Sequence, residues 1–68
     1  MSKGILTKRE KEVFSLLVQN KTTKEIADIL SISEKTVRNH ISNTMQKISV
    51  KGRAGAVVEL IRLGEITL

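Results

Sequence analysis

The apolar residues of this chain follow the spacing of short amphipathic helices. Within each of four segments they recur three and four positions apart, and each segment is preceded by a residue that can cap a helix. We therefore predict an all-α fold, a four-helix domain spanning residues 1–68 with a flexible arm at its start. The expected ranges are 1–6 for the arm and 8–19, 23–30, 34–48 and 53–63 for the helices.

The second and third helices lie almost back to back. Thr22 stands three residues before Glu25, the capping-box spacing that satisfies two unpaired amides at a helix start. Ser33 can cap the following helix after a very short turn. Two helices joined so closely, with the small residue Ala27 where they approach, indicate a helix-turn-helix motif. Such a motif places its second helix in the major groove of DNA.

The third helix has two chemically different sides. Its inner side is apolar, whereas its outer side is polar and cationic, with no acidic residue between Lys35 and Lys47. An ordinary solvated helix usually carries mixed Glu and Lys instead. Arginine reads guanine, asparagine reads adenine and serine reads either base. The predicted base-reading residues are therefore Arg38, Asn39, Ser42 and Asn43.

Phosphate contacts are expected around that outer side. The start of a helix offers free amides to anions, and lysines on either side can reach the DNA backbone. For each lysine taken separately, simple solubility is an equally good explanation. The predicted phosphate-binding residues are Thr22, Thr23, Lys24, Lys35, Thr36 and Lys47.

Composition supports a polyanionic partner without proving one. Twelve Lys and Arg against seven Asp and Glu give a net charge of +5, which favours binding through counterion release. One Phe with no Tyr or Trp leaves no platform for stacking RNA bases. We therefore favour double-stranded DNA over RNA.

Other functional classes find little support. No nucleophile–base pair and no glycine-rich phosphate loop stand out, so we do not expect an enzyme. His40 is the single histidine and cysteine is absent, so no metal or other cofactor is expected; we interpret His40 as a partly buried structural residue. No segment is long and apolar enough to span a bilayer, and a soluble, cytoplasmic, nucleoid-associated protein without a small-molecule substrate is expected.

The last helix carries more apolar surface than one core-facing stripe needs. Residues 54, 57, 58 and 61 form one face, and residues 56, 60 and 63 form another. One face can pack on the domain and the other on a second copy of the chain. We assign the homodimer interface to Ala56, Leu60 and Leu63. A compact monomer that buries both faces remains an alternative, as does a module that binds RNA polymerase or a sigma factor through this helix.

Five motifs give the chain a specific resemblance. They read LTKREKEVF at 6–14, TTKEIA at 22–27, SEKTVRNH at 33–40, MQKISVKGRA at 45–54 and AVVELIRLGE at 56–65. Together they resemble the LuxR/FixJ-type helix-turn-helix family, and most closely its sporulation regulators.

The resemblance implies a four-helix DNA-binding domain that dimerises through its last helix and regulates transcription. It also implies base reading by Arg38, Asn39 and Ser42, with Thr36 and the basic residues on phosphate. Because Met1 stands close to the first helix, we expect a stand-alone regulator.

Two features depart from the family pattern. Ser31 occupies a turn position where glycine is common, so a positive φ there would cost some strain. Gly52 and Gly55 replace the polar residues that usually open the last helix.

Overall fold

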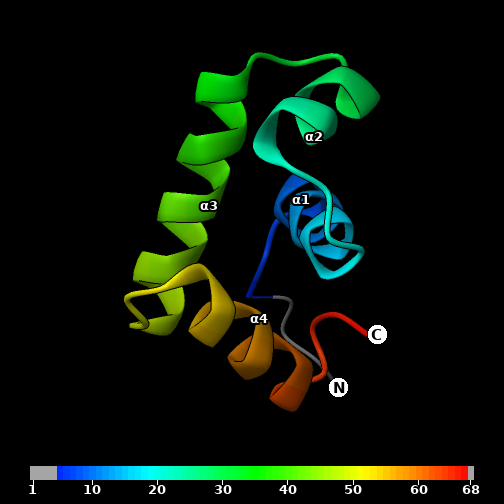
Figure 1. Cartoon of the computed structure of the whole chain (residues 1–68). Coiled ribbons are helices and arrows are strands. Elements are labelled where there is room, and N and C mark those ends of the chain that lie inside the picture. Colours follow the sequence, from blue (N-terminus) through cyan, green and yellow to red (C-terminus); the bar gives the residue numbers. More distant parts are fainter. Residues whose placement is uncertain (1–4, 68) are drawn as a thin grey trace.

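The computed structural model describes residues 5–67, and all regular structure in that range is helical. The helices are α1 (Lys8–Val18), α2 (Thr23–Leu30), α3 (Glu34–Ile48) and α4 (Arg53–Arg62), as Figure 1 shows. This confirms the predicted all-α architecture with a helix-turn-helix. The second and third helices have the predicted bounds, and the first and last each end one residue earlier. No helix within residues 5–67 combines the length and apolarity needed to cross a membrane.

The helix starts are fixed by the caps that the sequence indicates. Thr22 Oγ1 accepts the Glu25 amide at 3.1 Å, and the Glu25 carboxylate accepts the Thr22 amide at 2.8 Å. Thr7 and Glu10 form the same reciprocal pair at the start of α1. Ser33 Oγ accepts the Thr36 amide at 3.0 Å. Local side-chain chemistry therefore determines where three of the four helices begin.

The turn between α2 and α3 has the strained conformation expected for it. Ser31, the C-cap of α2, has φ 58°, in the left-handed region. Asn20 after α1 and Ser49 after α3 are also left-handed, at φ 68° and 58°. The left-handed conformation costs each serine roughly 1 kcal/mol of conformational free energy relative to a favourable backbone region. It allows the chain to reverse direction within very few residues.

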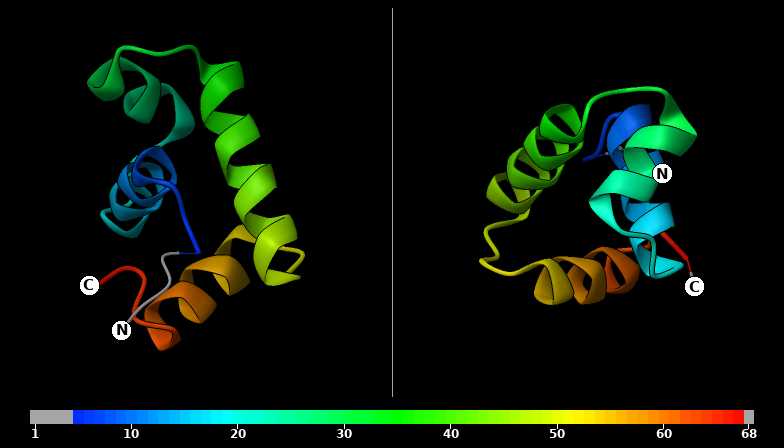
Figure 2. Two further views of the ribbon diagram at one scale, coloured as in Figure 1. Left: turned by 180° about the vertical axis from the view of Figure 1, so that it is seen from behind. Right: turned by 45° about the horizontal axis from the view of Figure 1, so that its top comes forward.

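α3 is the central element of the core. It packs against each of the other three helices, whereas α2 and α4 make no direct packing contact among the described residues. Figure 2 shows α1 and α2 together on one side of α3, with α4 lying across its far end. The largest fully buried side chains come from all four helices: Phe14, Ile26, Ile41 and Leu60, with Val13, Val37 and Thr44.

The predicted flexible arm is partly wrong. Residues 1–4 lie outside the described residues. Ile5 is exposed, but Leu6 is only 6% exposed and belongs to the hydrophobic core. The apolar side chain is buried because the segment before α1 runs alongside the core instead of leaving it.

A partly buried ion pair joins the start of α1 to the end of α3. Lys47 Nζ donates to Glu10 Oε1 at 2.6 Å and also reaches the Ile5 carbonyl oxygen at 3.4 Å. The Glu10 carboxylate is almost fully buried. Burial raises the pKa of this carboxyl, but the hydrogen bonds from Lys47 and Thr7 outweigh it, so the pKa lies below its usual value.

We expect Glu10→Gln to lower the free energy of unfolding at neutral pH by about 1–3 kcal/mol, because Lys47 loses a charged partner. A lowered folded-state pKa stabilises the fold above the ordinary glutamate pKa, near 4.3, and the gain disappears as pH falls through the folded-state value. Urea unfolding between pH 3 and 7 checks both points.

The matched control is Glu12→Gln on the same helix. Glu12 pairs with Arg9 at 3.3 Å, but both side chains are about two-fifths exposed, so we expect a loss below about 0.5 kcal/mol. Equal losses for the two variants would contradict the structural role of the Glu10–Lys47 pair.

Candidate nucleic-acid interface

The outer side of α3 is a continuous exposed polar surface. It is held outward because the opposite side is buried, with Val37, Ile41 and Thr44 all at most 1% exposed. Thr44 meets the cost of burial by donating its hydroxyl to the His40 carbonyl oxygen at 2.8 Å. The exposed residues, which we call the α3 outer face, are Lys35, Arg38, Asn39, Ser42, Asn43 and Gln46. All four residues predicted to read bases belong to this surface.

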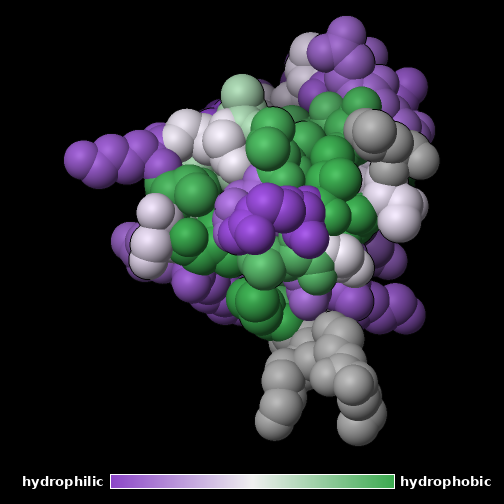
Figure 3. Space-filling view, turned by 90° about the horizontal axis from the view of Figure 1, so that it is seen from below, coloured by the Kyte–Doolittle hydropathy of each residue, from purple (hydrophilic) through white to green (hydrophobic). Residues whose placement is uncertain are grey.

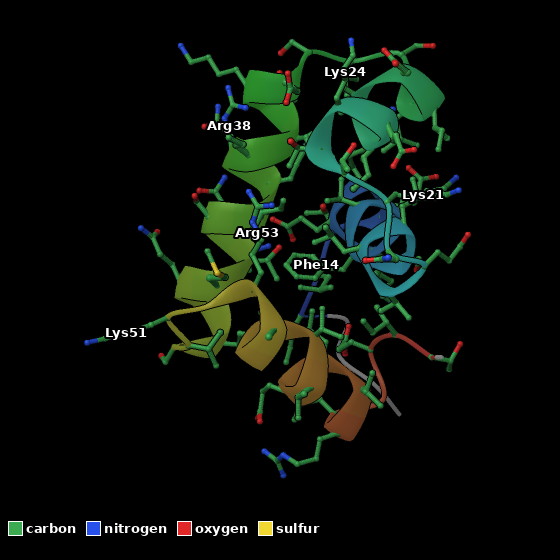
Figure 4. The ribbon with its side chains drawn as sticks, viewed as in Figure 1. Phe14, Lys21, Lys24, Arg38, Lys51 and Arg53 are labelled. Carbon is green, nitrogen blue, oxygen red and sulfur yellow. The ribbon has the colours of Figure 1, made fainter. Side chains whose placement is uncertain are left out.

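A polar network links the starts of α2 and α3. Thr23 Oγ1 donates to Glu34 Oε2 at 2.9 Å, and the same carboxylate oxygen lies 3.5 Å from Arg38 Nη1. Figure 4 shows Arg38 and Lys24 near the neighbouring ends of the two helices. The Glu34 carboxylate therefore contacts both Arg38, a predicted base reader, and Thr23, a predicted phosphate-binding residue.

The start of α2 retains donors for an anion. Its capping box uses the amides of Thr22 and Glu25. The amides of Thr23 and Lys24 therefore remain as first-turn donors without a helix acceptor. Lys24 is exposed beside them, which suits a phosphate group at this position.

The structure gives Lys47 a partner that the sequence did not indicate. Its ammonium group is held by Glu10 and by a backbone carbonyl, while its side chain stays 37% exposed. A phosphate contact by Lys47 stays a prediction, and a phosphate would compete with Glu10 for the ammonium group. The partner, Glu10, is 37 residues away in the sequence, and no local pattern indicates the pairing.

Two further basic residues lie beyond the end of α3. Lys51 and Arg53 lie in and just after the link to α4, and both are exposed. In Figure 4 the Lys51 side chain extends away from the domain. Both belong to the basic segment 51–53 that follows the third helix in the sequence.

His40 is half-buried on α3, in keeping with a structural role. Within residues 5–67, no group of three or more His, Cys, Asp or Glu side chains is placed to hold a metal ion.

The predicted dimer interface on α4 needs correction. Ala56 and Leu60 are 0% exposed because they face the domain's own core, so they have no surface to offer a partner. The outward face carries the other stripe, with Ala54 exposed, Val58 65% exposed and Val57 and Ile61 half-buried. Leu63, just beyond the helix, is also exposed. Figure 3 shows apolar surface surrounding a small polar area on this side of the molecule.

Comparison with known proteins identifies the family to which this chain belongs. Residues 4–60 match the family described as "Bacterial regulatory proteins, luxR family". The chain belongs to the LuxR family. The family resemblance read from the sequence motifs is therefore confirmed, and the chain is a DNA-binding transcription regulator of that family.

Individual LuxR-family relatives differ in how much of their length this chain spans. It is 75% identical over 67 residues to the spore germination protein GerE of Bacillus subtilis (strain 168), covering 98% of this chain and 90% of that protein. It is 50% identical over 60 residues to the transcriptional regulatory protein DegU of Brevibacillus brevis, covering 88% of this chain but 25% of DegU. A solved structure of the transcription factor GerE superposes with a TM-score of 0.93 at 58% identity, covering 96% of this chain and 97% of that one.

Glu34 Oε2 lies 3.5 Å from Arg38 Nη1 on this LuxR-family surface, so replacing Glu34 by the neutral residue Gln tests whether its carboxylate positions Arg38. In Glu34→Gln we expect affinity for arbitrary duplexes to rise about threefold, because one negative charge leaves the surface facing phosphates. The preference for the best duplex over a mismatched one should fall about three- to tenfold, because Arg38 loses its positioning partner.

Fluorescence anisotropy with matched and mismatched duplexes measures both quantities. Glu12→Gln on α1 removes the same charge away from the α3 outer face and should leave the preference unchanged. An unchanged preference in Glu34→Gln would show that Arg38 needs no such support.

Proposed function

We propose that this LuxR-family chain binds pseudo-palindromic duplex DNA as a homodimer, with α3 in the major groove. The observation that carries the proposal is the α3 outer face, which is exposed, free of acidic residues and made of side chains that read base edges. A solvated helix of the same length without a reading role would be expected to carry acidic residues as well.

The dimensions of α3 fit this placement. Its 15 residues extend over roughly 22 Å, whereas the major groove is about 12 Å wide. One end of the helix can therefore lie beneath each phosphate backbone. Lys24, Lys35 and Thr36 would contact phosphate at the first end, and Lys51 and Arg53 at the other. Thr22 and Thr23 would contribute the start of α2, whose free amides can also donate to a phosphate.

The outward face of α4 supplies the surface for a symmetric dimer. Val58 lies at the centre of this face, with Ala54 one turn before it, and burial against a second copy would remove apolar area from water. Two α3 helices related by a twofold axis would read half-sites about one helical turn apart, or a multiple of it.

The biological setting is proposed from the relatives. GerE of Bacillus subtilis is named as a spore germination protein, and we place this chain in the same process, spore development. As a transcription regulator it would act on the nucleoid in the cytoplasm. RNA polymerase or a sigma factor is the corresponding protein partner.

Selection of bound sequences from random duplexes tests the reading role. We expect a pseudo-palindromic preference for the wild type. Arg38→Ala should bind its best site about 1–3 kcal/mol more weakly and lose preference at one base position in each half-site. The reason is that Arg38 offers two donors in a fixed geometry to a base edge.

Lys35→Ala is the matched control on the same helix. A phosphate contact carries no sequence information, so this variant should bind all duplexes more weakly and lower the salt dependence by about one unit of slope. If Arg38→Ala instead retained the full base preference, α3 would not be reading through this residue.

Val58→Glu tests the corrected dimer interface. Placing a carboxylate on the centre of the apolar α4 face should leave the fold intact, because the side chain is exposed, and should convert the dimer to a monomer in sedimentation equilibrium. Affinity for a two-half-site duplex should fall at least about tenfold, while single half-site binding persists.

Ile29→Glu on α2 makes the same change at an exposed apolar residue away from α4 and should remain dimeric. A wild-type protein that is strictly monomeric, both free and on DNA, would contradict the homodimer. It would favour the alternative in which α4 binds a different protein.

A further inference from the structure

A groove that the DNA-reading role does not use runs between α1 and α2. It has a volume of about 390 Å³, and its lining residues are Lys8, Lys11, Glu12, Ser15, Leu16, Ile29 and Leu30. On α1 these residues lie on the side of the helix opposite Val13 and Phe14, which face the core. The groove is therefore separate from both the α3 outer face and the outward face of α4.

The floor of the groove is apolar, although its most exposed residue, Ile29, is not needed to fill the hydrophobic core. Ile29 is 53% exposed, although its neighbours on α2, Ile26 and Ala27, are buried in the core. Leu16 and Leu30 are half-buried on either side of the groove. Apart from Ile29, the large exposed apolar side chains of the described residues are Ile5 and the two at α4, Val58 and Leu63. Ile29 therefore marks a second apolar surface, well separated from the proposed dimer interface.

The rim of the groove is basic. Lys8 is exposed, and Lys11 keeps nearly half its side-chain surface while its Nζ lies 4.0 Å from the Glu65 carboxylate. Glu12 is the acidic residue of the lining, and it pairs with Arg9 at 3.3 Å as Lys11 pairs with Glu65. Among the lining residues this leaves Lys8 as the charge that forms no ion pair within the described residues, so the rim is net positive. An apolar floor with a cationic rim selects for an apolar ligand that also carries negative charge.

We propose that this groove is the docking site for an amphipathic helix of a partner protein that carries acidic residues beside its apolar anchors. From Lys8 to Leu16 the lining follows α1 for about 12 Å, the length of roughly two helical turns. That span matches apolar anchors at positions i, i+4 and i+7 of a docked helix. The lysines of the rim then face the acidic flank of that helix.

A second copy of this chain does not fit the groove as well. Its exposed apolar helix is α4, whose acidic residue Glu59 is already bound by Arg62. Arg53 adds a further positive charge on the same helix. An α4 face in the groove would therefore bring like charges together, which opposes binding.

The test is a titration of the whole chain, labelled with ¹⁵N, with three synthetic helical peptides of about four turns. The first carries leucines at i, i+4 and i+7 with glutamates beside them. The second replaces those glutamates by lysines, and the third replaces the leucines by serines. We expect saturable binding of the first peptide alone, with amide shifts concentrated in residues 8–16 and 29–30 and with affinity that falls as salt is raised.

Substitutions locate the contact. Ile29→Glu should weaken binding of the acidic peptide by about tenfold or more, and Lys8→Glu by about three- to tenfold. Val58→Glu, on the other apolar surface, should bind the peptide as the wild type does. Arg38→Ala should also bind the peptide normally while losing DNA preference, so failure of the groove and failure of DNA reading give different results.

Any of four outcomes of the peptide experiments would overturn the proposal. They are no saturable binding of the acidic peptide, equal binding of the acidic and basic peptides, shifts confined to α4, and peptide binding unaffected by Ile29→Glu. Loss of self-association in Ile29→Glu would also overturn it, because the groove would then be covered by a second copy of the chain.

Discussion

Burial of one side of α3 is the constraint on which the rest of the structure depends. Val37, Ile41 and Thr44 lie at the centre of the molecule, and α3 packs against all three other helices. Each fully buried aliphatic side chain contributes about 1.5–3 kcal/mol, which fixes the rotation of α3 about its axis. That rotation turns the α3 outer face toward solvent. The same packing that stabilises the domain therefore exposes the α3 outer face.

The helices around α3 are too short to be stable alone. α2 has eight residues, below the length at which an isolated helix persists in water. It is held by its capping box, by the burial of Ile26, and by the bond from Thr23 to Glu34 at the start of α3. Because the same carboxylate lies beside Arg38, the contact that joins the starts of the two motif helices also reaches a predicted base reader.

Apolar residues left outside the core divide into two separate surfaces. One is the outward face of α4 around Val58, and the other is the groove between α1 and α2 around Ile29. A small regulator that uses the α3 outer face for DNA, as proposed, has few remaining sides on which to meet other proteins. The charges around the two surfaces differ. A Glu59–Arg62 ion pair lies on α4, whereas lysines line the rim of the groove. The two surfaces are therefore suited to different partners.

By itself the sequence determined what local physics controls. Capping boxes and apolar spacing located four helices to within one residue, and the absence of acidic residues between Lys35 and Lys47 identified the polar side of α3. Only the tertiary structure decided which stripe of α4 is buried, because both stripes are apolar and packing geometry chooses between them. The pairing of Lys47 with Glu10 and the burial of Leu6 were likewise decided there. These contacts join residues far apart in the chain, and their free energy exists only once the helices have packed.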